Sequence, residues 1–265
     1  MWYLQSDILL RLLAACGFMI VFSGLTRLIF KKDLGPKVLI AADLAVLLYV
    51  SEKLAAISVG YMLITYAFVC ILKHVKKGRR CVFVFFSLLC TVPFFYGRIS
   101  EFFPSVPVLI TFTGIAYHML KAVDALYFVY YADMKIPFLT YSNYMLFFPV
   151  FTSGPIFRYR DFMRVFAKPV PLTWDRFIMC VKRFIKGMFK KMVVLYFVQT
   201  LFAHFVGMEK NILISFSIVV LSYLTLFFDL SGYSDIAIAT GSVMGYTVPE
   251  NFRKPWAAAS FTQFW

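Results

Sequence analysis

Long apolar stretches, separated by short runs of basic residues, constrain this chain more than any other feature. Of its 265 residues, 62% are hydrophobic and only 15% are charged, whereas soluble domains are about half apolar and about a quarter charged. The apolar stretches also have the lengths that helices need to cross a bilayer. We therefore predict an all-α polytopic membrane protein, a single membrane domain over residues 1–265, with roughly seven to nine membrane segments.

Basic residues between the apolar stretches produce the net charge of +14. Five lysines and arginines lie between Lys73 and Arg80, and such clusters are retained on the cytoplasmic side of a membrane. Attraction to anionic lipid explains the positive charge without nucleic acid, for which the sequence has no motif. The prediction is a multi-pass protein of the plasma membrane that contacts the lipid bilayer and no nucleic acid.

The N-terminal apolar stretch is predicted to be a retained helix. It lacks a basic start, extends from Ile8 to Phe30 and is followed at once by Lys31 and Lys32, which does not fit a cleaved signal peptide. Two further apolar stretches, 38–50 and 54–72, are expected to flank a kink.

Residues 147–162 interrupt the helical pattern. Pro149, Gly154 and Pro155 lie within seven residues, a combination that cannot continue a straight helix. Non-helical backbone at membrane depth must be covered by protein or line a water-filled cavity. We predict a re-entrant or interfacial segment, with Arg158 and Arg160 at its polar boundary.

The apolar stretch 108–131 carries His118, Lys121 and Asp124 in its middle. Lys121 and Asp124 are three residues apart, so they could form a buried ion pair on one helix face or line a polar tunnel. His118 is the one histidine placed for a membrane-embedded base, although a lone helical histidine is more often structural. The sequence shows no Ser/His/Asp or Cys/His arrangement.

Residues 174–192 have the clearest amphipathic pattern. Basic residues at 182, 183, 186, 190 and 191 lie opposite an apolar arc that includes Phe184 and Met188. Such a helix is typical of one lying flat on the cytoplasmic interface, with its basic face toward the headgroups. Direct contact with a substrate is the alternative. Further segments, 193–205 and 212–228, are expected to follow.

Two carboxylates, two hydroxyls and a tyrosine lie close together in residues 229–235. On a helix, Asp229 is four residues from Tyr233 and Ser231 four from Asp235, while Gly232 allows another backbone to approach closely. This pattern fits either a hydrogen-bonded packing network or a water-accessible chamber for a polar substrate. No histidine lies nearby, and the five cysteines are scattered, so we predict no metal site.

Three blocks of the sequence carry a family resemblance. Residues 148–162 contain FPV…GPI.RYRDF, residues 228–237 and 249–255 contain FDLSGYSDIA and PENFRKP, and residues 114–123 contain GIAY…KAV. In their order along the chain, from about residue 110 to the end, they resemble the membrane-bound O-acyltransferase family, in its bacterial DltB/AlgI-like branch. The resemblance implies part of that family's helical core.

It also implies an activity. Members move an acyl group from a cytoplasmic thioester, on an acyl carrier protein or acyl-CoA, to a hydroxyl of an extracytoplasmic glycopolymer. For this chain, acetyl transfer to exopolysaccharide is favoured over D-alanyl transfer to teichoic acid. The resemblance implies no bound cofactor, and a partner acyltransferase outside the membrane.

The resemblance places the family's catalytic histidine beyond Trp265, so no catalytic residue is assigned within this chain. His74, His118 and His204 match no catalytic position of the family. We expect the N-terminal part of the fold, from a truncated reading of a longer gene or from an inactive remnant. A non-catalytic membrane subunit is the first alternative, and a transporter or flippase the second, disfavoured because no internal repeat is visible.

The residues assigned to the site form two sets. The substrate-tunnel set is Asp229, Ser231, Tyr233, Ser234, Asp235, Glu250 and Asn251. The re-entrant or interfacial set is Gly154, Pro155, Arg158, Tyr159 and Arg160.

Overall fold

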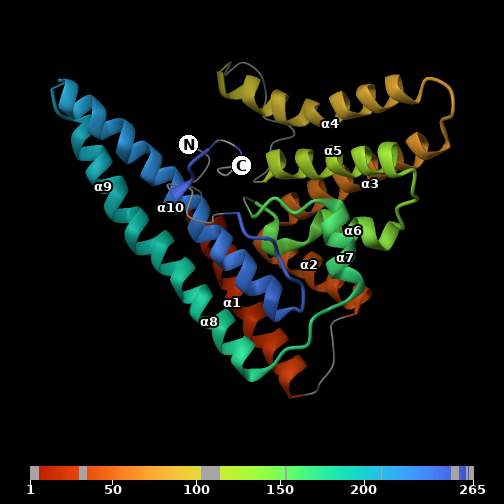
Figure 1. The fold of residues 1–265 in the computed structure, drawn as a ribbon, viewed down its shortest axis with the longest axis horizontal. Helices are drawn as coiled ribbons and strands as arrows, with labels where there is room; N and C mark the ends of the chain where they lie inside the picture. Colours follow the sequence, from red (N-terminus) through yellow and green to blue (C-terminus); the bar gives the residue numbers. More distant parts are fainter. Residues whose placement is uncertain are drawn as a thin grey trace.

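A computed structural model describes residues 6–29, 35–102, 114–152, 154–209, 211–251, 257–260 and 262. Across these ranges the regular structure is helical and contains no strand, which confirms the all-α prediction. In Figure 1, α8 and α9 follow one another as a single long rod that runs beside α10 and next to α1, while α3, α4 and α5 stack at an angle to them.

The N-terminal helices follow the predicted breaks. Their bounds are α1 Ser6–Leu28, α2 Pro36–Val50, α3 Glu52–His74 and α4 Arg79–Phe102. Ser51 separates α2 from α3 and caps α3, because its hydroxyl accepts a hydrogen bond from Leu54 N at 3.4 Å. The kink predicted between the two stretches is therefore confirmed, whereas Lys31 and Lys32 lie outside the described residues.

The basic loop after α3 is tied to the end of α5 (Ile115–Ala132). Lys73 Nζ and Arg79 Nη2 each lie 2.8 Å from Asp133 Oδ1, at the C-terminal cap of α5. The hydrogen bond from Lys73, followed by the contact with Arg79, lowers the pKa of the Asp133 carboxyl below its ordinary value. Two of the basic side chains in this loop therefore also hold α3, α4 and α5 together.

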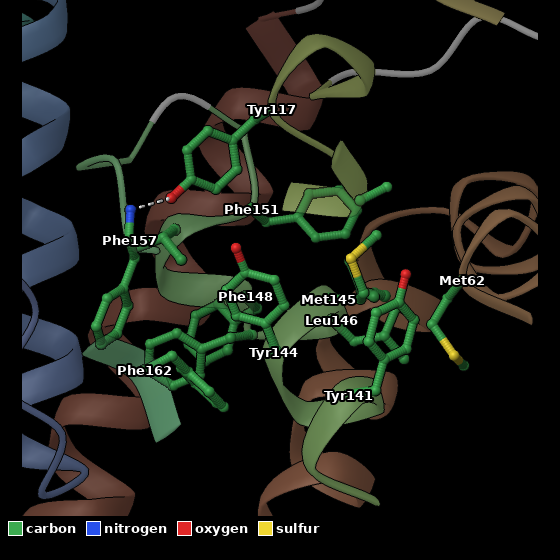
Figure 2. Close-up of a cluster of buried hydrophobic side chains, with 14 of the residues drawn as sticks. Met62, Tyr117, Tyr141, Tyr144, Met145, Leu146, Phe148, Phe151, Phe157 and Phe162 are labelled. Carbon is green, nitrogen blue, oxygen red and sulfur yellow. Dashed lines mark hydrogen bonds between the residues drawn. The ribbon is translucent and has the colours of Figure 1, made fainter. Parts of the chain in front are cut away.

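The predicted interruption at 147–162 is confirmed. The chain forms α6 (Phe138–Leu146), a 3₁₀ turn (Phe148–Val150), an extended stretch and α7 (Tyr159–Ala167). This irregular backbone lies inside the protein, among buried aromatic side chains such as Tyr144, Phe148 and Phe162 (Figure 2). Protein cover of this kind is what non-helical backbone needs within a membrane protein.

The amphipathic helix predicted at 174–192 exists, but it does not end there. α8 (Trp174–Phe189), a π-helical turn (Lys190–Val194) and α9 (Leu195–Val206) form one continuous rod that returns as α10 (Ile212–Val243). Thr173 and Asn211 cap the two rods, accepting hydrogen bonds from Arg176 N and Ile214 N. The prediction of a separate helix lying flat on the interface is therefore corrected. The apolar continuation through α9 makes the whole rod long enough to span a bilayer.

Within the described part of the chain, four helices are long and apolar enough to cross a membrane. They are Glu52–His74, Arg79–Ile99, Trp174–Val206 and Ile212–Val243. Leu13–Leu28 is apolar but shorter. The chain is a helical membrane protein, while the expected count of seven to nine segments is not confirmed.

Candidate functional site

The second half of α10 crosses α8 at a point where two glycines face each other. A Cβ atom added at Gly187 would lie 2.8 Å from Gly232 O, and one added at Gly232 would lie 3.2 Å from Gly187 O. Contacts this short leave no room for a side chain on either helix. The close backbone approach predicted at Gly232 is therefore confirmed, and Gly187 is its partner.

Ion pairs surround this crossing and form what we call the α8–α10 ion-pair cluster. Its members are Arg183, Lys190 and Lys191 from the α8–α9 rod, Asp229 and Asp235 from α10, and Glu250 from the segment after α10. Three cations meet three carboxylates, so the formal charges balance. Paired charges of this kind are the ones that a protein interior tolerates.

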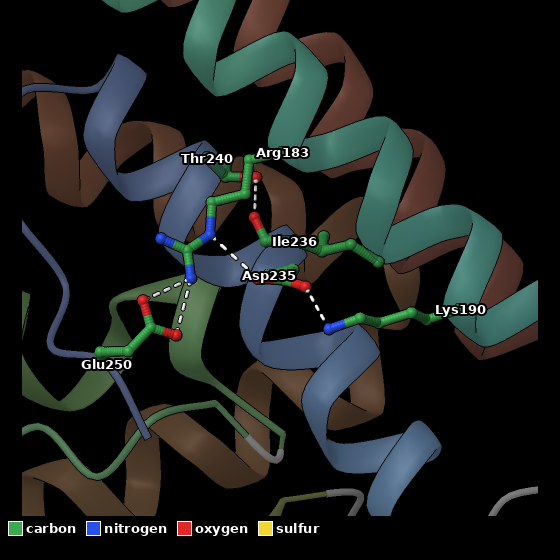
Figure 3. A network of polar contacts seen from close by, with 6 residues as sticks. All are labelled: Arg183, Lys190, Asp235, Ile236, Thr240 and Glu250. Carbon is green, nitrogen blue, oxygen red and sulfur yellow. Dashed lines mark hydrogen bonds and ion pairs between the residues drawn. The ribbon is translucent and has the colours of Figure 1, made fainter. Parts of the chain in front are cut away.

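Asp235 is the centre of the cluster (Figure 3). Its Oδ1 accepts a hydrogen bond from Arg183 Nε at 3.0 Å and its Oδ2 accepts one from Lys190 Nζ at 2.7 Å, while its side chain is only 8% exposed. Arg183 Nη2 also donates to both carboxylate oxygens of Glu250. Both Asp235 and Glu250 of the predicted set therefore bind one arginine.

A second pair lies farther along the same crossing. Lys191 Nζ donates to Asp229 Oδ1, and the two side chains are 7% and 14% exposed. The π-helical turn begins at Lys190 and Lys191, and interruptions of this type occur frequently at functional sites. Asp229 is thus paired with a lysine of the amphipathic stretch, whose basic face the sequence pattern directs toward lipid headgroups.

The hydroxyl residues of the predicted set are also buried. Ser231 and Ser234 are each 2% exposed, and their hydroxyl oxygens have no hydrogen-bond partner among the described residues. Tyr233 is 4% exposed, and its hydroxyl accepts a hydrogen bond from Thr152 N at 3.5 Å. Unsatisfied buried hydroxyls call for an explanation, such as a water or a ligand. Ion pairing thus explains the acids, whereas the two serines keep the chamber interpretation open.

The segment after α10 connects the cluster to residues 147–162, which we call the broken segment. Asn251 Oδ1 accepts a hydrogen bond from Ile156 N at 3.2 Å. Asn251 directly follows Glu250, which binds Arg183. A Cβ atom at Gly154 would lie 2.5 Å from Val150 Cα, so the fold needs glycine there. Asn251 and Tyr233 of the substrate-tunnel set therefore contact the backbone of the segment that carries the second set, at Ile156 and Thr152.

Within the re-entrant or interfacial set, burial divides the members. Gly154, Pro155 and Tyr159 are buried, whereas Arg158 and Arg160 are exposed. Tyr117 reaches this stretch from α5: its hydroxyl donates to Pro155 O and accepts from Phe157 N at 3.2 Å (Figure 2). Tyr117 was missed as a contributor because nothing in a local pattern predicts a contact 40 residues away.

Lys121 and Asp124 do not bind each other in the described contacts. Lys121 Nζ donates to Tyr144 O at 2.9 Å, while Asp124 Oδ2 accepts from Tyr159 N at 2.6 Å. Asp43 of α2, which the sequence did not single out, accepts from Phe148 N at 3.3 Å. The predicted ion pair is thus wrong: these charges satisfy backbone groups that the broken helix leaves without partners.

The described histidines do not converge on the cluster. His118 is fully buried, with Nδ1 3.1 Å from Gly114 O and its ring 4.4 Å from that of Phe151. His74 Nδ1 lies 2.8 Å from Cys70 O, and His204 packs beside Phe205. Among the residues with described positions, no group of three or more His, Cys, Asp or Glu side chains could hold a metal ion.

Comparison with known proteins shows that the chain is similar to alginate O-acetylases and teichoic acid D-alanyltransferases. The chain is 29% identical over 155 residues to a probable alginate O-acetylase of Pseudomonas fluorescens, covering 57% of this chain and 31% of that protein. It is 29% identical over 206 residues to the teichoic acid D-alanyltransferase of Bacillus subtilis, covering 72% and 51%. The corresponding protein of Lacticaseibacillus rhamnosus is 28% identical over 162 residues, covering 56% and 40%. The chain thus spans about a third to a half of the length of these relatives.

The sequence profile of the membrane-bound O-acyltransferase family matches residues 108–265, which is more than half of the chain. This range contains the broken segment, the α8–α9 rod, all of α10 and Asn251. The residues around the Gly187–Gly232 crossing therefore lie within the matched range. Because the match covers more than half of the chain, the chain belongs to the membrane-bound O-acyltransferase family.

Proposed function

We propose that the protein carrying this chain is an O-acyltransferase of the plasma membrane. It crosses the membrane several times and moves an acyl group to a hydroxyl of an extracytoplasmic cell-envelope glycopolymer. The observation that carries the proposal is the family match over residues 108–265. Relatives named for two such polymers, alginate and teichoic acid, support the acceptor class.

The reaction consists of one group transfer. A general base takes the proton of the acceptor hydroxyl, whose oxygen attacks the thioester carbonyl carbon. The carbon–sulfur bond then breaks, and the thiol leaves with a proton. The family resemblance implies that the base is a histidine, and none of the histidines described above is assigned to that role. The donor is an acyl carrier protein or acyl-CoA, and a partner acyltransferase outside the membrane assists delivery to the polymer.

In this proposal the chain's own residues shape the route of the substrate. Ser231 and Ser234 supply hydroxyls for a polar group, because they are buried and lack protein partners in the described structure. The α8–α10 ion-pair cluster holds α10 and the broken segment in register through Arg183, Glu250 and Asn251. Asp229 and Asp235 are positioning residues, since each carboxylate is already bound by a lysine.

The transferred group is acetyl or D-alanyl. Acetyl is preferred on the sequence blocks, whereas the alignment with a D-alanyltransferase covers more of this chain, 72% against 57%. The assay must therefore offer both donors. Membranes containing the protein are incubated with radiolabelled acetyl-CoA, or with carrier protein bearing radiolabelled D-alanine, and with alginate or teichoic acid. Label recovered in alkali-labile ester linkage to one polymer identifies donor and acceptor.

Site variants decide whether the activity depends on these residues. Asp235→Asn and Glu250→Gln are expected to lower transfer more than they lower the amount of protein in the membrane. Equal losses would make these residues purely structural. Normal abundance and co-purification of a partner without any transfer would favour a non-catalytic subunit, and substrate flux in proteoliposomes without transfer would favour a transporter.

A further inference from the structure

The short helix α7 lies beside a cavity and has a buried face, a face that lines the cavity and an exposed basic edge. The cavity has a volume of about 470 Å³ and is lined mainly by carbon. Its walls are Gly35, Pro36, Thr140, Met163, Phe166, Ala167, Pro169 and Tyr246. Volumes of this order are typical of small-molecule sites. The cavity lies between α7 and the start of α2, away from the α8–α10 ion-pair cluster.

The faces of α7 follow from its helical spacing. Tyr159 and Phe162 are buried in the core. At 100° per residue, the lining residue Phe166 lies between these two, and the lining residues Met163 and Ala167 come next around the helix. Arg160 and Arg164, four residues apart, form the edge beyond them, and both are exposed. The cavity therefore lies between the buried face of α7 and a basic edge.

Further positive charge flanks the same cavity. Lys168 directly follows Ala167, and Lys37 directly follows Pro36, and both side chains are exposed. The acid on this helix, Asp161, is 4.0 Å from Arg164 and lies on the side of α7 away from the cavity. Four basic residues against one acid leave a net positive rim.

We propose that this cavity binds one acyl chain of an anionic phospholipid, whose phosphate is held by Arg160 and Arg164. An apolar cavity with a cationic rim complements an amphipathic anion with a hydrocarbon tail. Basic residues beside a hydrophobic site bind anionic headgroups, each residue contributing about fivefold in affinity. An acidic protein would also be attracted by the arginines, but it would leave the carbon-lined cavity unfilled. The site is independent of the proposed acyl transfer.

The test uses the full chain in detergent micelles that contain trace phosphatidylglycerol with a diazirine in its acyl chain. Phosphatidylcholine with the same chain is the zwitterionic reference. After illumination, labelled peptides are located by mass spectrometry. We expect phosphatidylglycerol to label residues 163–169 in preference to phosphatidylcholine, by on the order of tenfold at sub-saturating lipid.

Variants separate the headgroup from the tail. Arg160→Gln with Arg164→Gln is expected to reduce phosphatidylglycerol labelling to the phosphatidylcholine level, whereas Lys182→Gln with Lys186→Gln, on the exposed side of α8, leaves it unchanged. Ala167→Trp fills the cavity from an exposed position and lowers labelling by both lipids. Equal labelling by the two lipids, unaffected by the arginine variants, would overturn the proposal. So would displacement of the lipid by a soluble acidic carrier protein, which would identify a protein-docking surface.

Discussion

The two halves of α10 present opposite environments on one continuous helix. In the first half, large apolar residues are exposed: Ile212 by 92%, Leu213 by 73% and Phe216 by 67%. In the second half, nearly every residue from Ser231 to Val243 is buried, including two serines, two glycines and Asp235. In a membrane, large apolar side chains can face lipid. The buried positions between helices are therefore enriched in small and polar residues, which let the helices pack closely.

Within α10, apolarity does not locate the buried part of the helix. The exposed half is the more hydrophobic, and a rule taken from soluble proteins would place it inside. What distinguishes the buried half is the close crossing at Gly187 and Gly232 and the ion pairs around it. The comparison can be tested by changing residues in each half and around the crossing.

The largest expected effect is at the crossing. Gly187→Leu would force a side chain against Gly232 O and Ile236, and we expect a loss of more than about 3 kcal/mol in stability, or no folded protein. Thermal unfolding in detergent and the amount of protein in membranes measure this. Gly60→Leu is the matched control, because nothing lies within 4 Å of a Cβ there. Tolerance of Gly187→Leu would show that the helices need not touch.

The next largest effect concerns Asp235. Asp235→Ala leaves Arg183 and Lys190 without their shared acid, and the expected cost is about 2 to 4 kcal/mol, because both cations retain some exposure. Asp175→Ala, which removes an exposed acid at the start of α8, should cost under about 1 kcal/mol. The same unfolding measurement applies, and similar losses in both variants would contradict a central role for Asp235.

A direct comparison of the halves uses two apolar truncations. Ile236→Ala removes a fully buried side chain and should cost about 2 kcal/mol through the cavity it leaves. Leu213→Ala, at a residue that is 73% exposed, should cost less than about 0.5 kcal/mol. Unfolding temperatures in one detergent compare them. If Leu213→Ala proved the more costly, α10 would pack against something on its apolar side.

A smaller effect separates the two interpretations of the buried serines. Ser231→Ala and Ser234→Ala remove hydroxyls without described partners. The free energy of unfolding should therefore change by less than about 1 kcal/mol. Acyl transfer should fall by about tenfold, the value of one lost hydrogen bond to substrate. A large loss of stability without a specific loss of activity would place both serines in the packing network.

The smallest effect is expected at the exposed end of α5. Because the native pKa of Asp133 is lowered, its contribution is complete above the ordinary value of 3.8 and is lost as the pH falls through the lowered native value. Asp133→Asn should therefore reduce stability at neutral pH. It should also remove the share of the stability lost on acidification that comes from protonation of Asp133. Unfolding measured from pH 6 to pH 2 tests this, and 1 M salt should shrink the difference between the proteins. A difference that grows toward acid would contradict the assignment.

Local chemistry predicted much of the helical layout. The break at Ser51 and the basic loop before Arg79 are recognisable from one turn of sequence, because each depends on neighbouring residues. Pro149, Gly154 and Pro155 likewise predicted a broken helix wherever the segment packed. Gly232 predicted a close approach, although not the identity of Gly187 opposite it.

The partners of the charged residues could not be predicted in the same way. The pattern of residues 174–192 separated a basic from an apolar face, but it could not reveal that Arg183, Lys190 and Lys191 meet acids of a neighbouring helix instead of headgroups. Lys121 and Asp124 looked like a pair by spacing, yet Lys121 binds a carbonyl at the end of α6 and Asp124 binds the backbone at the start of α7. Such choices depend on which groups lie within hydrogen-bonding distance after folding.

The sequence by itself determined that this protein is helical, belongs in a membrane and breaks its helices at prolines, glycines and polar runs, because these properties depend on composition and on neighbouring residues. Only the tertiary structure decided that Asp235 and Glu250 share Arg183, that Asn251 binds the broken segment and that Gly187 meets Gly232. The reason is physical: a buried charge or an unpaired backbone group takes whichever partner the packing brings near, and sequence spacing does not specify that partner.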